Sequence, residues 1–282
     1  FFLPFPRLDL RLGWAATENS KRAHYLEIIN DKVLVISGLG QTIYFDKKNI
    51  NLEKLGQKEI SNNIDEFLVS QNFELIGIRD LFYDDGYVYI SLQHKDSNGY
   101  TINIYRSEYN LKRLTFKPFF SINEYWDKYN VFSGGRLELF DKNKILFSVG
   151  FAKNYEAPQD KNSLLGKIIS IDKLTKDFQI ESYGHRNPQG LSYLKEKDVI
   201  INTEHGPFGG DEINLNFLYD NFQDKNYGWP ISSTGKPYPN EKKIFEKNNW
   251  LTKTHKEQGF VEPLKSYSPA IGISEVVSLR KE

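Results

Sequence analysis

The chain has 282 residues, of which 37 are basic and 37 acidic, so its formal net charge is zero. This balance gives no electrostatic reason to expect nucleic acid or an anionic membrane as a partner. The lack of cysteine excludes disulfides and thiolate metal sites. The chain begins with the apolar run FFLPFP, which is too short to span a bilayer. This run is either the remnant of a removed signal or anchor, or a strand that packs on the domain, and we expect no transmembrane segment.

One pattern occurs four times along the chain: an apolar run, a polar turn, a strongly β-prone run, a loop and a further β-prone run. The runs that follow the turns begin at Val33, Tyr87, Ile145 and Val199, at intervals of 54 to 58 residues. Val, Ile, Tyr and Phe around turns of Asp, Asn and Gly are typical of β-hairpins. A near-constant interval of this size predicts a repeated sheet, and the blades of a β-propeller are four-stranded sheets of about this length.

Signals for helices are few, and short helical turns are expected only within 53–68 and 121–129. We therefore predict an all-β fold, and the regular interval favours a β-propeller over a β-sandwich with irregular loops. Residues 1–282 are predicted as one domain, in which 231–258 is a polar loop insertion. The segment VEPLKSYSPAIGISEVVSL is expected to begin a fifth unit, which gives about four blades and the start of another. Because a propeller closes its last blade against its first, we expect C-terminal blades to be missing from this chain.

The stretch from Tyr183 to Pro230 gathers turn formers, cations, amides and aromatic residues. It contains YGHRNPQGLSY, then NTEHGPFGGDEINL, then NYGWP. Loops on a rigid scaffold are where binding groups collect. This stretch is therefore the predicted position of a binding site.

The sequence motifs GHRNPQGL, EHGPFGGDEINL and NYGWP occur in this order and spacing. In these motifs the chain resembles the soluble PQQ-dependent aldose (glucose/sorbosone) dehydrogenase family. A weaker resemblance extends to the repeats on either side. The resemblance implies a six-bladed β-propeller with PQQ and calcium as cofactors. It also implies a sugar substrate, a separate electron acceptor, and a periplasmic or secreted location.

Candidate cofactor residues follow from the resemblance. A rigid guanidinium fork and two amides suit a flat ligand rich in carboxylates and carbonyls, such as PQQ. Arg186, Asn187 and Gln189 are therefore the candidate PQQ-binding residues, with turn formation between blades as the alternative for the first two. The resemblance places calcium at the main-chain carbonyls of Gly206 and Pro207, and carbonyl oxygens are good ligands for this hard ion.

The expected catalytic residues are replaced. In the family, a histidine takes the proton of the sugar hydroxyl while hydride moves to PQQ, and an acidic partner orients that histidine. The matching positions here hold Phe132 and Phe151. A phenyl ring cannot accept a proton. His205 is the candidate for a replacement base, because imidazole is the natural base near neutral pH; the alternative is a structural, hydrogen-bonding histidine.

Two functions from different classes remain open at this point. The first is PQQ- and calcium-dependent oxidation of aldose sugars, with the usual catalytic histidine position replaced by Phe132. The second is a non-catalytic β-propeller that binds a ligand or a protein partner on its central face. The fold serves both, so the residues at the centre of the site must decide. Phe132 and Phe151 directed into the central site would exclude the usual catalytic route.

Overall fold

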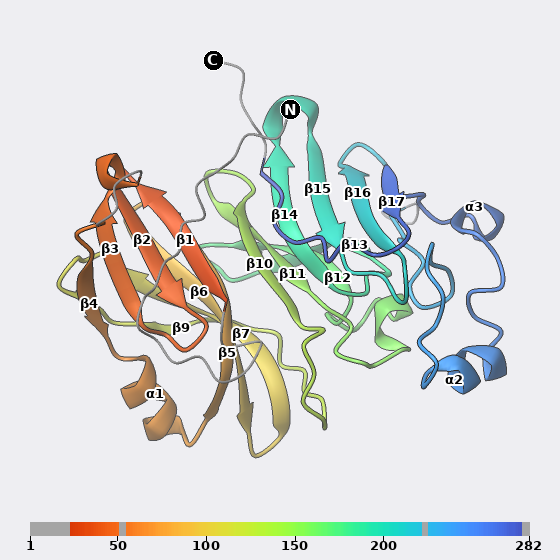
Figure 1. The fold of residues 1–282 in the computed structure, drawn as a ribbon, viewed down its shortest axis with the longest axis horizontal. Coiled ribbons are helices and arrows are strands. Elements are labelled where there is room, and N and C mark those ends of the chain that lie inside the picture. Colours follow the sequence, from red (N-terminus) through yellow and green to blue (C-terminus); the bar gives the residue numbers. More distant parts are fainter. Residues whose placement is uncertain (1–22, 51–54, 222–224, 278–282) are drawn as a thin grey trace.

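The structure, a computed structural model, describes residues 23–50, 55–221 and 225–277. The apolar run at the start of the chain lies outside these residues. Four antiparallel sheets succeed one another in chain order, from the red strands to the blue ones (Figure 1). The described part of the chain is therefore mostly β, as the sequence predicts.

The first two sheets are joined by a short strand. The first sheet consists of β1 (His24–Ile29), β2 (Lys32–Ser37), β3 (Thr42–Asp46) and β4 (Lys58–Asn62). The second consists of β5 (Glu74–Asp84), β6 (Tyr87–Asp96), β7 (Gly99–Glu108) and β9 (Lys117–Ser121). Between β7 and β9 the chain leaves its own sheet, and β8 (Arg113–Leu114) pairs in parallel with β4.

The third and fourth sheets carry the candidate site. The third consists of β10 (Gly134–Leu139), β11 (Lys144–Val149), β12 (Lys167–Asp172) and β13 (Phe178–Tyr183). The fourth consists of β14 (Pro188–Leu194), β15 (Val199–Glu204), β16 (Asp211–Phe217) and β17 (Lys265–Tyr267). The short helices are α1 (Ile64–Gln71), α2 (Lys242–Lys247) and α3 (His255–Gln258), with single 3₁₀ turns at Lys47–Asn49, Ala157–Gln159 and Lys195–Lys197.

The four predicted repeats correspond to the first three strands of the four sheets. Three expectations need correction. The segment expected to begin a fifth unit instead supplies β17, the outer strand of the fourth sheet, and 268–277 contain no strand. The stretch 121–129 forms no helical turn, and the helix expected within 53–68 runs from Ile64 to Gln71. The insertion 231–258 is more ordered than a plain loop, because it contains α2 and α3.

The core lies between successive sheets. The first strands of neighbouring sheets contact one another, β1 with β5, β5 with β10, and β10 with β14. Apolar side chains fill the space behind them: Leu34 with Ile90 between the first two sheets, and Leu146 with Ile200 between the last two. Burial of such side chains is the main favourable term in folding. Among the described helices, none has the length and apolar character to cross a bilayer.

A buried lysine holds the loop between β11 and β12. The ammonium of Lys167 is fully buried and donates to the carbonyls of Ala157, Pro158 and Leu165 at 2.7, 3.1 and 2.8 Å. Three carbonyl oxygens replace the water that the ion loses on burial. The loop that follows Phe151 therefore has a fixed path against the third sheet.

A second charged group fixes the end of the described chain. The Asp211 carboxylate accepts hydrogen bonds from the backbone N–H groups of Ile271, Gly272 and Ile273 at 3.0, 2.7 and 3.1 Å. Hydrogen bonds to an ionised carboxylate are among the stronger ones in proteins. This contact keeps the segment after β17 against the fourth sheet.

His94 in β6 makes stability sensitive to acid. Its ring is 1% exposed and stacks on Phe73 at 4.2 Å, and its Nε2 accepts from the amide of Asn103 at 3.1 Å. Burial lowers the pKa of His94 to about 4. The unfolded chain binds this proton near its ordinary value of about 6.5, whereas the folded chain does not. Stability is therefore lost as the pH falls from the unfolded value toward the folded one.

We predict that the free energy of unfolding falls between pH 6.5 and 4 by up to about 1.4 kcal/mol per pH unit because of His94. His94→Gln should remove this part of the acid dependence. Urea unfolding at several pH values measures it, with exposed His24→Gln as the control that retains the wild-type slope. Equal slopes for the wild type and His94→Gln would contradict the assignment.

Candidate functional site

The turn between β13 and β14 places the candidate cofactor residues. Gly184 begins it with a φ of +76°, and a Cβ atom there would lie 2.2 Å from Oδ1 of Asn226. Only glycine suits this combination of backbone angle and close approach. His185 follows with no exposed surface, its Nε2 2.8 Å from the hydroxyl of Ser182 and its ring stacked on Tyr227. His185 is therefore a structural residue that fixes the path of the next residue.

Arg186 is the most buried cation of the site. Its backbone N–H donates to Oε2 of Glu204 at 2.9 Å, and its Nη1 donates to the carbonyl of His205 at 2.8 Å. Its Nε and Nη2 are buried and meet no hydrogen-bond acceptor among the described residues. Burial lowers the pKa of Arg186. A buried guanidinium with free N–H groups costs stability unless other contacts offset it.

Aromatic rings supply those contacts. Four ring centroids lie 4.7 to 5.8 Å from the guanidinium carbon, and we call these rings the Arg186 cage: Phe132, Phe151, Trp229 and Tyr238. A cation beside aromatic faces is stabilised by about 0.5 to 2 kcal/mol per favourable contact, most of all where water is excluded. The guanidinium is thus enclosed by this chain's own side chains.

Both replaced catalytic positions belong to this cage. Phe132 and Phe151 lie 5.5 Å apart between ring centroids, and Phe151 has no exposed surface. Phe151 also contacts Trp229 at 5.4 Å and shares a core cluster with Phe245 of α2. The two phenylalanines therefore lie together at the centre of the site, with the insertion 231–258 packed behind them.

The structure joins four of the sequence-predicted site residues in one hydrogen-bonded network. Asn187 accepts at its carbonyl from the backbone N–H of His205 at 3.1 Å. The side-chain oxygen of Asn187 accepts from Gln189 at 3.0 Å and from the backbone of Gly134 at 3.2 Å. With the bond from Arg186 to His205, these contacts hold the turn before β14 against the turn after β15.

The Gly206-Pro207 turn approaches the backbone behind it very closely. A Cβ atom on Gly206 would overlap the carbonyl of Gly210, so glycine is required. The Pro207 carbonyl already accepts from the N–H of Gly210 at 3.2 Å. Among the described residues, no group of three or more His, Asp or Glu side chains is placed to hold a metal ion. Calcium at this turn would therefore depend on main-chain oxygens, as the resemblance implies.

Buried carboxyl groups lie next to this turn. Glu204 and Glu212 are 3% and 4% exposed, and the Glu212 carboxylate accepts from the hydroxyl of Thr234 at 2.9 Å. Burial, together with the charge of Glu204, raises the pKa of Glu212 to about 8. A cavity of about 10 Å³ lies between these groups, Arg186 and Gly206. That volume is enough for about one water molecule.

These dimensions test whether the present arrangement fits PQQ. Sites for small molecules occupy about 300 Å³ or more, whereas the cavity beside Arg186 has about 10 Å³. Arg186 lines this cavity, and its guanidinium carbon lies beside the rings of the cage. The residues in this arrangement therefore do not fit PQQ at Arg186, and a ligand of that size requires the cage to open.

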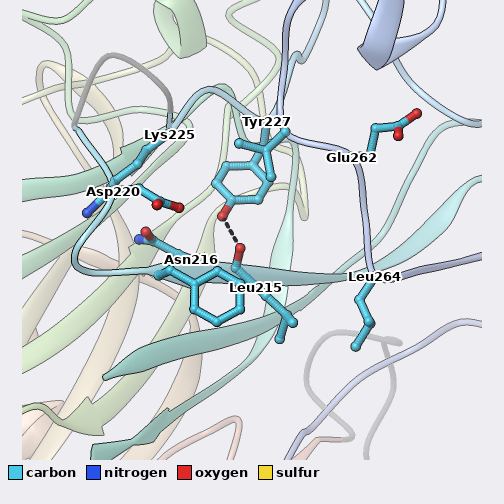
Figure 2. A pocket seen from close by; sticks show the side chains of 9 residues that line it. Leu215, Asn216, Asp220, Lys225, Tyr227, Glu262 and Leu264 are labelled. Atoms are coloured by element: carbon cyan, nitrogen blue, oxygen red, sulfur yellow. Dashed lines mark hydrogen bonds between the residues drawn. The ribbon is translucent and has the colours of Figure 1, made fainter. Parts of the chain in front are cut away.

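A larger cavity lies on the outer side of the fourth sheet. It has about 230 Å³, a mostly apolar wall, and a lining that includes Leu215, Tyr227 and Leu264. Figure 2 shows the Tyr227 hydroxyl directed at the carbonyl of Leu215, to which it donates at 2.7 Å. None of the candidate cofactor, metal or catalytic residues lines this cavity, but Tyr227 also lines the small cavity beside Arg186.

The sequence did not predict that aromatic residues of the insertion 231–258 help to enclose Arg186. Tyr238 of the cage lies in 231–258, and so do Phe245 and Trp250, which pack on Tyr155 behind the cage. The one available signal is the presence of aromatic residues in a stretch that is otherwise polar. Tyr227 and Trp229 of the NYGWP motif are core residues, each 2% exposed.

The fold and the sequence motifs of the site agree with membership of a sugar dehydrogenase family. The family model for glucose/sorbosone dehydrogenase matches residues 75–282, and the chain belongs to this family. It is 28% identical to an uncharacterized protein of Synechocystis over 223 residues, 71% of this chain and 51% of that protein. It is 33% identical to the aldose sugar dehydrogenase YliI of Escherichia coli over 118 residues, 37% of this chain and 30% of that protein.

A solved structure shows the same fold. The PQQ-bound aldose sugar dehydrogenase of Streptomyces coelicolor superimposes with a TM-score of 0.60 at 19% identity, over 89% of this chain and 69% of that one. The chain spans about half, or less, of the length of the curated relatives that it matches. The activity of the whole relatives is therefore not transferred by the match alone.

We predict that Phe151→Ala lowers the free energy of unfolding by about 3 to 5 kcal/mol, because it empties a fully buried position between three aromatic rings. Phe178→Ala is the matched control, since Phe178 is 51% exposed, and it should cost less than about 1 kcal/mol. Urea unfolding of the two variants measures both values. Similar losses of unfolding free energy at the two positions would contradict the central packing role of Phe151 in the Arg186 cage.

Proposed function

We propose that the chain is a β-propeller of the sugar dehydrogenase type that does not oxidise sugars by the usual route, and that it acts as a non-catalytic module binding a ligand or a protein partner. One observation carries this proposal: Phe132 and Phe151, at the positions of the family's base and its acidic partner, pack around Arg186. Phenyl rings move no proton, and general base catalysis is worth about 10²- to 10⁴-fold in rate.

The proposed overall architecture rests on the four observed sheets and on the family resemblance. The four consecutive sheets, with their first strands in contact, support this proposal, because propeller blades are successive four-stranded sheets. We propose that they are blades of a six-bladed propeller, as the resemblance implies, and that residues 1–282 form a single domain. The central face then carries Asn187, Gln189 and His205.

A second candidate is a PQQ- and calcium-dependent aldose dehydrogenase with altered chemistry. Family membership favours it, and so do the unpaired N–H groups of Arg186, which an anionic cofactor would satisfy if the cage opened. Arg186, Asn187 and Gln189 would then bind PQQ, the carbonyls of Gly206 and Pro207 would hold calcium, and His205 would serve as the base. An aldose would be the substrate, with a separate electron acceptor, in the periplasm or outside the cell.

His205 is a weaker base candidate than its chemistry alone indicates. Its Nε2 is buried and meets no hydrogen-bond partner among the described residues. A base must lie within hydrogen-bond reach of the proton that it takes. The altered enzyme therefore requires His205, as well as the cage, to become accessible.

An activity assay tests the first candidate. We expect the protein, supplied with PQQ and Ca²⁺, to show no aldose-dependent reduction of a redox dye, because the phenyl ring of Phe132 cannot act as the base. The soluble aldose dehydrogenase of Escherichia coli serves as the positive control. Phe132→His, at a half-buried position, places an imidazole where the family has one. Aldose oxidation by the unaltered chain would contradict the proposal. Activity that appears only in Phe132→His would show that the replacement at this position causes the loss of activity.

A thermal melt tests the second candidate. A ligand that binds the folded state at a hundredfold excess over its Kd stabilises by about 2.7 kcal/mol. We expect no upward shift with PQQ and Ca²⁺, because the Arg186 cage is closed. A shift that disappears with chelator, and shrinks in Gln189→Ala, would instead establish cofactor binding at this site and favour the altered enzyme.

A further inference from the structure

A polar cleft lies on the outer side of the second sheet, away from the candidate site. It forms where the chain leaves β7, pairs as β8 with the first sheet, and returns as β9. Its volume is about 470 Å³. This lies within the range of about 300 to 1,000 Å³ that small-molecule sites occupy.

Positive charge dominates the lining of the cleft. Arg106, Arg113 and Lys117 line it, against the single carboxylate of Glu108. Arg113 pairs with Glu66 at 2.8 Å, but that pair is exposed and contributes little. Arg106 and Lys117 form no ion pair with any acid in the described part of the chain. Two cations of the lining therefore have no direct ion pair among the described residues, although Glu108 lies in the same cleft.

Arg106 is held in place by stacking. Its guanidinium carbon lies 4.4 Å from the ring centroid of Tyr87 and 5.3 Å from that of Phe119. A stacked guanidinium keeps its planar fork in one orientation, so less conformational entropy is lost when it binds an oxyanion through two N–H groups.

A neighbouring lysine places a second positive charge beside the ring on which Arg106 packs. The ammonium of Lys176 lies 3.7 Å from the ring centroid of Phe119, on which Arg106 also packs. Burial, and then the positive charge of Arg106, lower the pKa of Lys176. Cations that repel one another across a single ring gain from an anion placed beside them.

We propose that this cleft binds a small ligand through an oxyanion, a carboxylate or a phosphate group, that Arg106 grips with two N–H groups and Lys117 approaches from the rim. The tyrosine rings of the lining, Tyr87 and Tyr109, offer flat apolar faces for the remainder of the ligand. The site is independent of the function proposed above, because it shares no residue with the Arg186 cage.

Calorimetric titration of the protein with inorganic phosphate and with glucuronate, at low ionic strength, tests the proposal. Low salt is needed because screening weakens exposed charge interactions. Saturable binding of at least one of the two is expected. Tighter binding of phosphate identifies a phosphate ligand, and tighter binding of glucuronate identifies a carboxylated sugar.

Substitutions then locate the binding. Arg106→Gln should weaken it by at least about tenfold, because a charge-assisted bidentate pair is lost. Lys95→Gln is the matched control, since Lys95 also lies over a tyrosine ring, 5.4 Å from the centroid of Tyr100. It should leave the affinity within about twofold. If Arg106→Gln does not fold, exposed Lys117→Gln replaces it, with a smaller expected loss.

Two results would overturn the proposal. The first is the lack of saturable binding of either anion. The second is an equal loss of affinity in Arg106→Gln, or in its replacement Lys117→Gln, and in Lys95→Gln, because general attraction to a positive surface depends on net charge and not on position.

Discussion

The enclosure of the Arg186 guanidinium is the constraint on which the site depends. An isolated cation in a protein interior costs several kcal/mol, and its partners must offset this cost. Here the partners come from three separated parts of the chain: the segments around Phe132 and Phe151, the word that contains Trp229, and the insertion that contains Tyr238. Removing any one of these aromatic rings leaves the Arg186 guanidinium with fewer stabilising contacts. Residues from the segments beside the third and fourth sheets and from the insertion therefore meet at one side chain.

The backbone explains how a site of this kind can change its chemistry while the fold persists. The carbonyl of Phe132 accepts from the N–H of Ala152 at 2.9 Å, and the N–H of Phe151 donates to the carbonyl of Arg186 at 2.8 Å. These bonds do not depend on the side chain at either position. A polar pair and an aromatic pair can therefore occupy the same backbone, which is why membership of a fold family does not settle activity.

The sequence predicts the inner strands better than the outer ones. Strands such as β2, β6 and β11 are rich in Val, Ile and Phe and follow clear turns, so local pattern suffices. The outer strands β9 and β17 read KPFFS and KSY, and each pairs with a neighbouring strand on one edge only. Such edge strands need no apolar run, so periodicity does not reveal them. The same limit explains why β17 was expected to open a fifth unit.

Sequence motifs identified the residues of the site, but they did not identify the side chains that surround these residues. The words around Arg186 and Gly206 identify a turn that brings binding groups together, and the structure does join Arg186, Asn187, Gln189 and His205. What sequence cannot give is which rings cover the guanidinium, because those contacts join positions up to about 50 residues apart along the chain and no local period records them. Whether these residues bind a cofactor stays a prediction.

The ammonium of Lys167, ringed by three carbonyl oxygens, has a consequence for how this part of the molecule is maintained. Many proteins shape a loop of this kind around a bound cation, and such loops are lost when the ion is removed. In this chain the nitrogen that donates to the three carbonyls is attached covalently to β12, so it cannot leave the loop as a metal ion can. Burial lowers the pKa of Lys167 to about 7, so its charge depends on pH near neutrality. The segment that carries Phe151 into the cage is therefore held by a tethered group that a chelator cannot remove.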